Sequence, residues 1–183
     1  KMNNQETFNI QNIKLIVGLG NPGKEYTKTR HNAGFLFLDY LCESFLTENK
    51  FKSEVSSINI NSKKILTTKP LTYMNSSGEA VLAISQFYKI NPEEILVVHD
   101  DLDIKLGEYK LQFNKGPKVH NGILSIENML SSSEFWRLRI GIDNRDGELR
   151  KNISGSDYVL GRFTQEELDV LAQTFKAIKD TNL

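Results

Sequence analysis

Lys14-Leu-Ile-Val-Gly18 and Ile95-Leu-Val-Val-His99 are two short apolar runs in the first two thirds of the chain. Runs of this kind are typical of strands that are buried on both faces of a sheet. Helical spacing of apolar residues between and after these runs predicts helices over 35–48, 77–89 and 122–130. Strands and helices therefore alternate. The sequence predicts an α/β fold, a single domain with a twisted mixed β-sheet flanked by helices on both faces.

A hairpin and further strands complete the predicted sheet. Residues 53–60 and 63–69 carry β-branched residues in partial alternation, and Asn61-Ser62 between them is typical of a hairpin turn. Thr164-Gln-Glu-Glu167 is a capping box, which predicts the start of a last helix. Other strands are expected over 108–113 and 138–142.

Composition indicates a globular protein without internal disulfides. The chain has 183 residues, of which 39% are hydrophobic and 25% charged, and this suits one domain of ordinary size. Cys42 is the sole cysteine, so we expect a reducing compartment. No apolar run reaches the roughly 18 residues that a membrane helix needs, and residues 1–12 lack the apolar core of a signal peptide. We therefore expect a cytoplasmic protein with no membrane partner.

Residues 1–12 are polar and aperiodic, which predicts a flexible N-terminal arm before a domain over 13–183. Lysine and arginine number 23, as do aspartate and glutamate, so the net charge is zero. Neutrality removes the simplest argument for a polyanionic partner. The segment 105–151 nevertheless holds nine basic and six acidic residues. A local basic patch stays open there, beside the simpler interpretation of a solvated surface.

Gly18-Leu-Gly-Asn-Pro-Gly23 fits the G-x-G-x-x-G pattern of dinucleotide sites, and Asp39 lies at about the distance of a ribose-binding acid. The context argues against such a site. Residues 24–30 are polar and lack the helical spacing that should follow the third glycine, and Asp39 falls inside a predicted helix. We interpret the glycines as a turn that presents Asn21 at the carboxyl end of the first strand.

Four further motifs place histidine, asparagine or aspartate after a strand or before a helix. They are His31-Asn32, Asn75, His99-Asp100-Asp101 and His120-Asn121. Each alone is explained as well by helix capping or packing. Together they could line one cleft at the carboxyl ends of the strands, where ligands bind in α/β sheets.

The residue types limit the chemistry of such a cleft. Three histidines and one cysteine show no zinc-site spacing, and Lys105 and Leu106 occupy positions where a calcium loop needs an oxygen ligand and a glycine, so no metal is expected. No G-x-S-x-G elbow is present, and Cys42 lies in an apolar helix stripe, which argues against a side-chain nucleophile. A His–Asp pair that activates water remains, and it predicts hydrolysis by general base catalysis.

In order and spacing, these motifs and others resemble the bacterial peptidyl-tRNA hydrolase family, from Ile13 to beyond Phe163. The matching segments are GLGNPGKEY, RHNAG, YMNSSGEAV, VVHDDLDIKLG, HNGILSI, FWRLRIGI and YVLGRF. The resemblance implies a monomer without a cofactor, which hydrolyses the ester between a peptide and the 3′ ribose of tRNA and so recycles tRNA during translation. The alternative is a non-catalytic RNA-binding relative of the same fold.

The resemblance also implies roles for single residues. His31 is then the base that activates water, while Asp100 orients its imidazole and stabilises the imidazolium. Asn75 would place its amide at the developing oxyanion. The other implied contacts are the peptide and terminal nucleotide for Asn21 and Asn75, the ester end or the water for Asn121, and the cleft wall for His120 and Tyr26.

Basic residues are implied at the phosphates of the tRNA acceptor stem. Lys110 and Arg139 resemble the family's phosphate contacts, which fits recognition of a tRNA end by a neutral protein. The chain departs from the family at Gln112, where a second basic residue is common. Lys115 and Lys118 are candidates to replace that charge.

A second departure is the segment 113–119, which has one glycine where the family has a glycine-rich run. Pro117 fixes its own φ, and the β-branched Val119 adds stiffness beside His120. We expect this cleft wall to be less mobile than a glycine-rich one.

Overall fold

The two apolar runs form adjacent strands at the centre of the sheet. In the computed structural model, which describes residues 6–183, they are β1 (Leu15–Gly18) and β5 (Ile95–Lys105), paired in parallel. β4 (Lys63–Pro70) lies parallel to β1 on its other side, and β7 (Trp136–Asp143) lies parallel to β5. The connections leave in opposite directions at β1 and β5, so this is the switch point where α/β sheets bind ligands.

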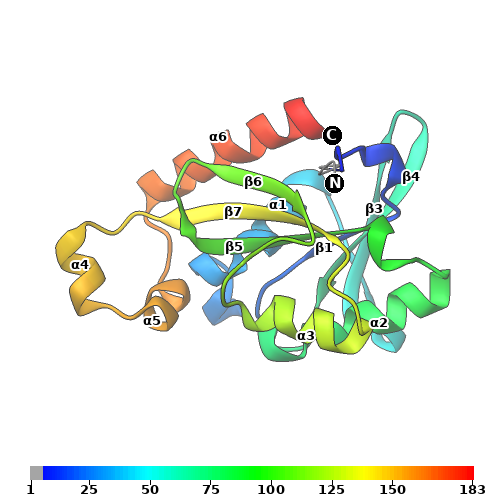
Figure 1. Ribbon diagram of the computed structural model, residues 1–183, viewed down its shortest axis with the longest axis horizontal. Helices are drawn as coiled ribbons and strands as arrows, with labels where there is room; N and C mark the ends of the chain where they lie inside the picture. The colour runs from blue at the N-terminus through cyan, green and yellow to red at the C-terminus, as the bar shows by residue number, and fades with distance from the viewer. Residues whose placement is uncertain (1–5) are drawn as a thin grey trace, which may run out of the picture.

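Three further strands complete the mixed sheet: β2 (Leu46–Glu48), β3 (Ser53–Ile60) and β6 (Tyr109–Phe113). The seven strands have the order β2-β3-β4-β1-β5-β7-β6 (Figure 1). The predicted hairpin is confirmed as antiparallel β3 and β4. Asn61 and Ser62 both adopt left-handed φ angles, 49° and 65°, which match a tight turn to the twist of the strands.

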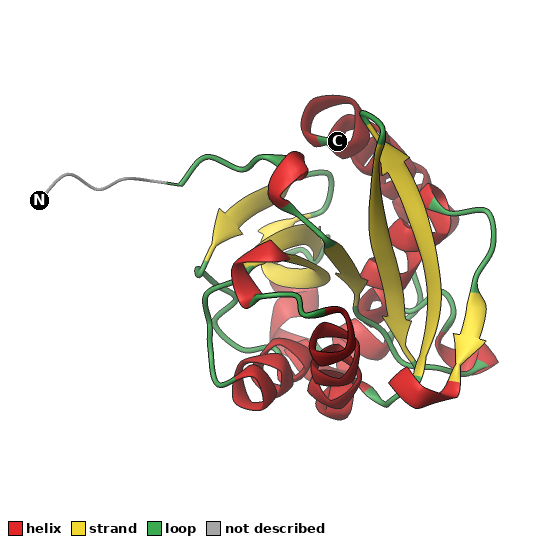
Figure 2. Ribbon diagram, turned by 90° about the vertical axis from the view of Figure 1, so that its right-hand side faces the viewer, coloured by secondary structure: helices red, strands yellow, loops and turns green. Residues whose placement is uncertain are grey.

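Helices cover both faces of the sheet, as the sequence predicts (Figure 2). One hydrophobic core includes Ile16 and Leu96 and packs against α1 and α6. The other includes Val17 and packs against α2 and α3. Neighbouring strand residues thus point to opposite cores. These helices are α1 (Ala33–Leu41), α2 (Ser77–Tyr88), α3 (Asn121–Leu130) and α6 (Gln165–Asn182). The capping box at Thr164 is confirmed at the start of α6.

The predicted helix over 35–48 is wrong in its second half. The helix ends at Leu41, because Cys42 adopts an extended backbone and residues 46–48 pair with β3 as a strand. Phe45 continues the apolar spacing but packs at the edge of the first core, with the Lys69 ammonium 4.1 Å from the centre of its ring. Strand pairing therefore overrides the helical pattern.

Short helices and turns connect these elements. The sequence did not predict α4 (Gly147–Asn152) or α5 (Gly155–Leu160), which begin at the capping side chains of Asp146 and Ser154. The 3-10 turns are η1 (Ile10–Asn12), η2 (Lys24–Tyr26), η3 (Arg30–Asn32), η4 (Asn49–Phe51), η5 (Met74–Ser76) and η6 (Pro92–Glu94).

The structure differs from a loose arm over part of residues 1–12. Phe8 stacks edge-on against Trp136, with ring centroids 5.1 Å apart, and Ile10 is buried in the first core. Residues 1–5 of the predicted arm lie outside the described residues, and the domain boundary at residue 13 stays a prediction. Over residues 6–183, no helix is both long and apolar enough to cross a membrane.

Candidate active site

The site forms at the carboxyl end of β1, which lies beside the middle of β5. His31 lies in η3, which leads directly into α1, and Asp100 is part of β5. Gly34, in the first turn of α1, lets the helix approach the strands, since a Cβ atom there would come within 2.3 Å of the Val98 carbonyl oxygen. This close approach brings His31 beside Asp100.

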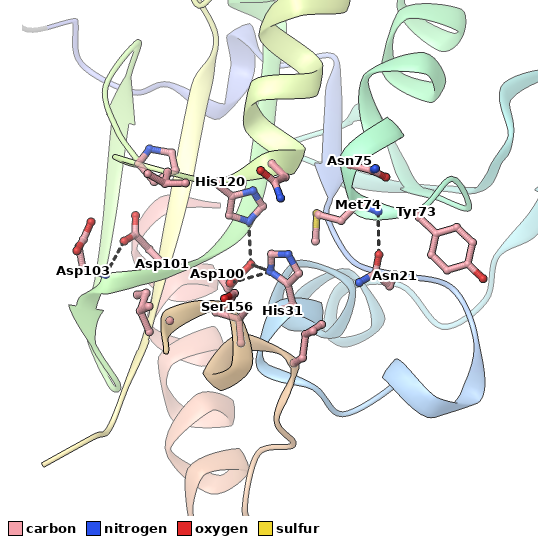
Figure 3. A pocket seen from close by; sticks show the side chains of 17 residues that line it. Asn21, His31, Tyr73, Met74, Asn75, Asp100, Asp101, Asp103, His120 and Ser156 are labelled. Carbon is pink, nitrogen blue, oxygen red and sulfur yellow. Dashed lines mark hydrogen bonds and ion pairs between the residues drawn. The ribbon is translucent and has the colours of Figure 1, made fainter. Parts of the chain in front are cut away.

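Asp100 joins two histidines that are distant in the sequence (Figure 3). His31 Nδ1 lies 3.0 Å from both carboxylate oxygens of Asp100, and His120 Nε2 lies 2.9 Å from Oδ1. The side chains of Asp100 and His120 are 2% and 4% exposed, whereas that of His31 is 14% exposed. In this His31–Asp100–His120 cluster, His31 is the member most open to the solvent.

Hydrogen bonds fix the tautomers of both histidines. His120 caps α3, and its Nδ1 accepts from the backbone N–H groups of Gly122 and Ile123. The proton of neutral His120 is therefore on Nε2, which donates it to Asp100. His31 donates from Nδ1 to the same carboxylate, so its Nε2 carries a lone pair that no group of residues 6–183 occupies. His31 can take a proton from water, whereas both ring nitrogens of His120 are occupied.

The charges in the cluster favour ionised Asp100 and a more basic His31. Burial raises the pKa of Asp100, but the attraction and hydrogen bonds of the two histidines outweigh it and hold this pKa well below its usual range. Burial lowers the pKa of His31, but attraction to Asp100 and their hydrogen bond raise it above 6.5 overall. The pair thus stabilises the imidazolium that forms when His31 accepts a proton.

Three consecutive residues of η3 bind three different elements. Asn32 holds the end of β1, since its Oδ1 accepts from Asn21 N at 2.8 Å and its Nδ2 donates to Asn21 O at 3.0 Å. His31 binds the carboxylate of β5, and Arg30 binds Glu167 of α6 at 2.8 Å. The turn is therefore anchored on both sides of His31, which fixes the direction of the imidazole.

Amide side chains lie near the cluster on three segments. Asn21 Oδ1 accepts from Met74 N at 2.8 Å, which leaves its Nδ2 group for a ligand. Asn75 is exposed in η5 just before α2, and Asn121 is the exposed first residue of α3. All three asparagines line the same cavity as His31.

This cavity has a volume of about 590 Å³ and brings together most of the predicted site. The predicted residues that line it are Asn21, His31, Asn75, Asp100, His120 and Asn121. Other lining residues were not predicted as site residues from the sequence. They include Tyr73 and four residues of α5, namely Gly155, Ser156, Val159 and Leu160. The YVLGRF motif at 158–163 was the one signal that pointed to α5.

Tyr26 is not among the residues that line this cavity, and its place in the cleft wall stays a prediction. It ends η2, and its carbonyl oxygen accepts hydrogen bonds from the backbone N–H and the hydroxyl of Thr29, at 3.0 and 2.9 Å. Tyr26 shapes the loop that leads to His31.

Arg139 is buried and paired, which differs from an open phosphate contact. Its Nε donates to Asp101 at 2.8 Å and its Nη1 donates to Gln112 at 2.7 Å. Gly116 packs on the guanidinium, where a Cβ atom would come within 2.5 Å of Cζ. The neutral side chain of Gln112 suits this partner, since a basic residue would repel it. Phosphate binding by Arg139 stays a prediction, and these contacts disfavour it.

The predicted lysine contacts are exposed but not equivalent. Lys110 lies on the edge strand β6 and lines a different, polar cavity of about 500 Å³. Lys115 and Lys118 lie in the loop between β6 and α3, and the loop residues Pro117 and Val119 line the site cavity. Lys115 and Lys118 are thus close in sequence to residues that line the site cavity, whereas Lys110 is not. Phosphate binding by any of the three lysines stays a prediction.

A metal ion is disfavoured at the His31–Asp100–His120 cluster, although its ligand atoms lie within 4.8 Å of one another. Coordination by Nε2 of neutral His120 would require a proton on Nδ1, and that atom already accepts two backbone N–H groups. The cap of α3 therefore opposes metal binding.

His99 packs against the cluster on the side away from the cavity, which it does not line. Its Nδ1 donates to the Asp100 carbonyl oxygen at 2.7 Å, and its ring packs edge-on against that of His120 with centroids 5.0 Å apart. Complete burial lowers the pKa of His99 to about 3, so this side chain is neutral at physiological pH.

Comparisons with known proteins find relatives over nearly all of the chain. The family model described as Peptidyl-tRNA hydrolase matches residues 15–182. A peptidyl-tRNA hydrolase of Neisseria meningitidis serogroup C is 47% identical over 176 residues, which cover 92% of this chain and 90% of the relative. One of Bacillus cereus (strain Q1) is 45% identical over 159 residues, covering 85% and 83%. The crystal structure of the peptidyl-tRNA hydrolase from Acinetobacter baumannii matches with a TM-score of 0.81 and 39% identity, covering 90% of this chain and 84% of that one.

Proposed function

The chain belongs to the peptidyl-tRNA hydrolase family, and on that premise we propose that His31 and Asp100 perform its reaction. The enzyme hydrolyses the ester bond that joins a peptide, or an N-blocked aminoacyl group, to the 3′ ribose of tRNA. The observation that carries the assignment is the free Nε2 lone pair of His31, held by Asp100 at the edge of a cavity. A non-catalytic RNA-binding protein would not need this poised base.

In the proposed mechanism, a water molecule attacks the ester carbonyl carbon while His31 Nε2 takes its proton. The tetrahedral intermediate then breaks its bond to the ribose 3′ oxygen, and the imidazolium returns the proton to that oxygen. The products are a peptide with a free carboxylate and a tRNA with a free 3′ hydroxyl. Asp100 stays ionised throughout and stabilises the imidazolium.

The remaining residues hold the substrate and the cluster. Asn75 places its amide as a donor to the developing oxyanion, and the free Nδ2 group of Asn21 binds the peptide or the terminal nucleotide. Asn121 contacts the ester end or the water. His120 positions Asp100, because its own lone pair is taken by the backbone of α3. General base catalysis of this kind needs no cofactor.

The setting of the reaction is proposed on the resemblance to the family. The protein acts in the cytoplasm as a monomer and recycles peptidyl-tRNA during translation. The exposed Lys110, Lys115 and Lys118 meet the acceptor stem.

Release of an N-acylated amino acid from charged tRNA tests the catalytic assignment. His31→Ala should lower turnover by about 10²–10⁴, the usual contribution of a general base. Asp100→Asn should also lower turnover, though not abolish it, because the imidazolium of His31 loses its stabilising charge. Its control is Asp169→Asn, at an exposed position on α6, which should leave turnover unchanged. Near wild-type turnover in His31→Ala would exclude His31 as the base. Wild-type protein that binds charged tRNA and releases no acyl group would favour the non-catalytic alternative.

A further inference from the structure

Arg30 is partly buried beside the proposed base and contacts both α5 and α6. Its side chain is 12% exposed, and that of its partner Glu167 is 4% exposed. Nη2 donates to Glu167 Oε1 at 2.8 Å, and Nη1 donates to the Tyr158 carbonyl oxygen at 3.3 Å. The guanidinium carbon lies 4.0 Å from the centre of the Tyr158 ring. Arg30 thus binds two helices at once.

The backbone of the same segment is also tied to the end of α5. Arg30 N donates to the Gly161 carbonyl oxygen at 2.9 Å, and Phe163 N donates to the Lys28 carbonyl oxygen at 2.9 Å. Gly161 is packed closely here, since a Cβ atom would come within 2.7 Å of Arg30 Nη1. Backbone hydrogen bonds therefore attach the turn that carries His31 to the segment after α5.

The helix that Arg30 holds forms one side of the site cavity. Residues Gly155, Ser156, Val159 and Leu160 line the cavity, and we call them the α5 wall. A helix of six residues is not stable by itself in water, so tertiary contacts must fix its place. On the side away from the cavity, those contacts centre on the buried Tyr158.

The ion pair between Arg30 and Glu167 is poorly suited to stability alone. Among residues 6–183, Arg30 Nε and Glu167 Oε2 are buried without a hydrogen-bond partner. Burying charges is costly, and a hydrophobic pair of similar volume is often as stable or more stable. The planar guanidinium instead offers directional contacts to a carboxylate, a carbonyl and an aromatic ring together. Such geometry suits alignment.

We propose that Arg30 is a positioning residue that holds the α5 wall in place beside His31, so that the wall can bind the substrate next to the base. The wall is aligned through Glu167 and Tyr158. His31 itself is fixed by Asp100 and by Asn32, so loss of Arg30 displaces the wall and spares the base. The substrate role of the wall rests on the proposed function.

Steady-state kinetics of Arg30→Met, Arg30→Lys and Ile178→Val test this role. Ile178 is buried in α6, in the hydrophobic core that also contains Tyr158. Its variant therefore controls for a general loss of stability. Arg30→Met should raise KM about 10-fold and change kcat less than about threefold, since loss of wall contacts weakens substrate and transition state alike. Arg30→Lys should fall between wild type and Arg30→Met, and Ile178→Val should leave both constants near wild type.

Amide hydrogen exchange over residues 155–161 gives a second readout that does not need activity. Exchange there should be faster in Arg30→Met than in Ile178→Val. If Arg30→Met fails to fold, Glu167→Gln takes its place, because it keeps the size of the side chain. Exchange in Glu167→Gln should likewise be faster than in Ile178→Val. Unchanged KM with protected α5 amides would overturn the proposal, as would a loss confined to kcat. A wild type without hydrolytic activity would overturn the proposed function only, and the exchange result would still decide the coupling.

Discussion

A histidine that is hydrogen-bonded to an aspartate can act as a base only if its second ring nitrogen is free. His31 meets this condition, because Nδ1 is the atom that faces Asp100. His120 does not, because the N–H groups of Gly122 and Ile123 occupy its Nδ1 lone pair. Two histidines on one carboxylate therefore have different chemistry, and backbone amides make the difference.

The rate should depend on pH through His31. Protonated His31 cannot accept a proton from water, and Asp100 raises its pKa, so kcat/KM should fall as the pH drops through a value above 6.5. Asp100→Asn removes the cause that raises the pKa and leaves burial, which lowers it. The pH profile of this variant should shift to lower pH, with a reduced plateau. A profile in Asp100→Asn that coincides with wild type would contradict the pairing.

Asn75 should affect the chemical step more than binding. Asn75→Ala should lower kcat by up to about 10²–10³ if its amide donates to the oxyanion. Asn128→Ala, an exposed change on α3 away from the cavity, is the matched control. Steady-state kinetics separate the outcomes, since an effect confined to KM would assign Asn75 to ground-state binding.

Among the elements, the loop between β6 and α3 contacts both the site cavity and the buried Arg139. Pro117 and Val119 line the cavity, while Gly116 packs on the guanidinium of Arg139. Arg139 in turn is paired with Asp101 of β5. The loop thus rests on a buried ion pair, which agrees with the expectation of a stiff cleft wall without testing its mobility.

The lysines of this loop provide a test of tRNA binding. Replacing Lys115 and Lys118 together by alanine should weaken tRNA binding and reduce its salt dependence, because fewer counterions are released. Hydrolysis of a minimal ester without the acceptor stem should be unchanged. Binding at several salt concentrations, measured beside Lys176→Ala on α6 as a control, checks this. Equal losses on both substrates would instead mean that the loop shapes the active site.

For the whole molecule, the site depends on a sheet that is covered on both faces. The two cores bury β1 and residues 95–101 of β5, so the first residues of β5 to reach the solvent lie near its carboxyl end. His99 lies in the buried part of β5 and is neutral. Its protonation is therefore linked to unfolding of the entire domain.

Acid should destabilise the fold through His99. Below its unfolded pKa, the unfolded state binds a proton that the folded state, with a pKa of about 3, does not. The free energy of unfolding should therefore fall by up to about 1.4 kcal/mol per pH unit between about pH 6 and 4.5. His31, whose pKa is raised, keeps its full contribution there, and Asp100, whose pKa is lowered, loses its contribution only below that window.

Chemical denaturation of His99→Phe across that pH range checks the assignment. The variant keeps an aromatic ring against His120 and removes the titrating group, so its stability should depend less on pH than that of wild type. Equal slopes in the two proteins would show that His99 is not the source of the acid sensitivity.

Local sequence patterns predict most elements, and with the family resemblance they point to the main site residues. Apolar runs predict β1 and the first half of β5 because strands buried on both faces are mostly apolar. The turn at Asn61-Ser62 and the capping box at Thr164 are local hydrogen-bonding preferences, so local sequence is enough to place them. The motifs around His31 and Asp100 likewise identified the cluster, and the resemblance to the family supplied its chemistry.

Features that depend on contacts between distant segments follow from the three-dimensional fold instead. The helix after Gly34 ends at Leu41 because residues 46–48 pair with β3, and no local pattern records that pairing. The short α5 is fixed by Arg30, which lies far away in the sequence. The backbone amides of Gly122 and Ile123 occupy Nδ1 of His120, and this contact supports the resemblance's choice of His31 as base. Such contacts form only when the sheet brings the segments together, so spacing along the chain cannot specify them.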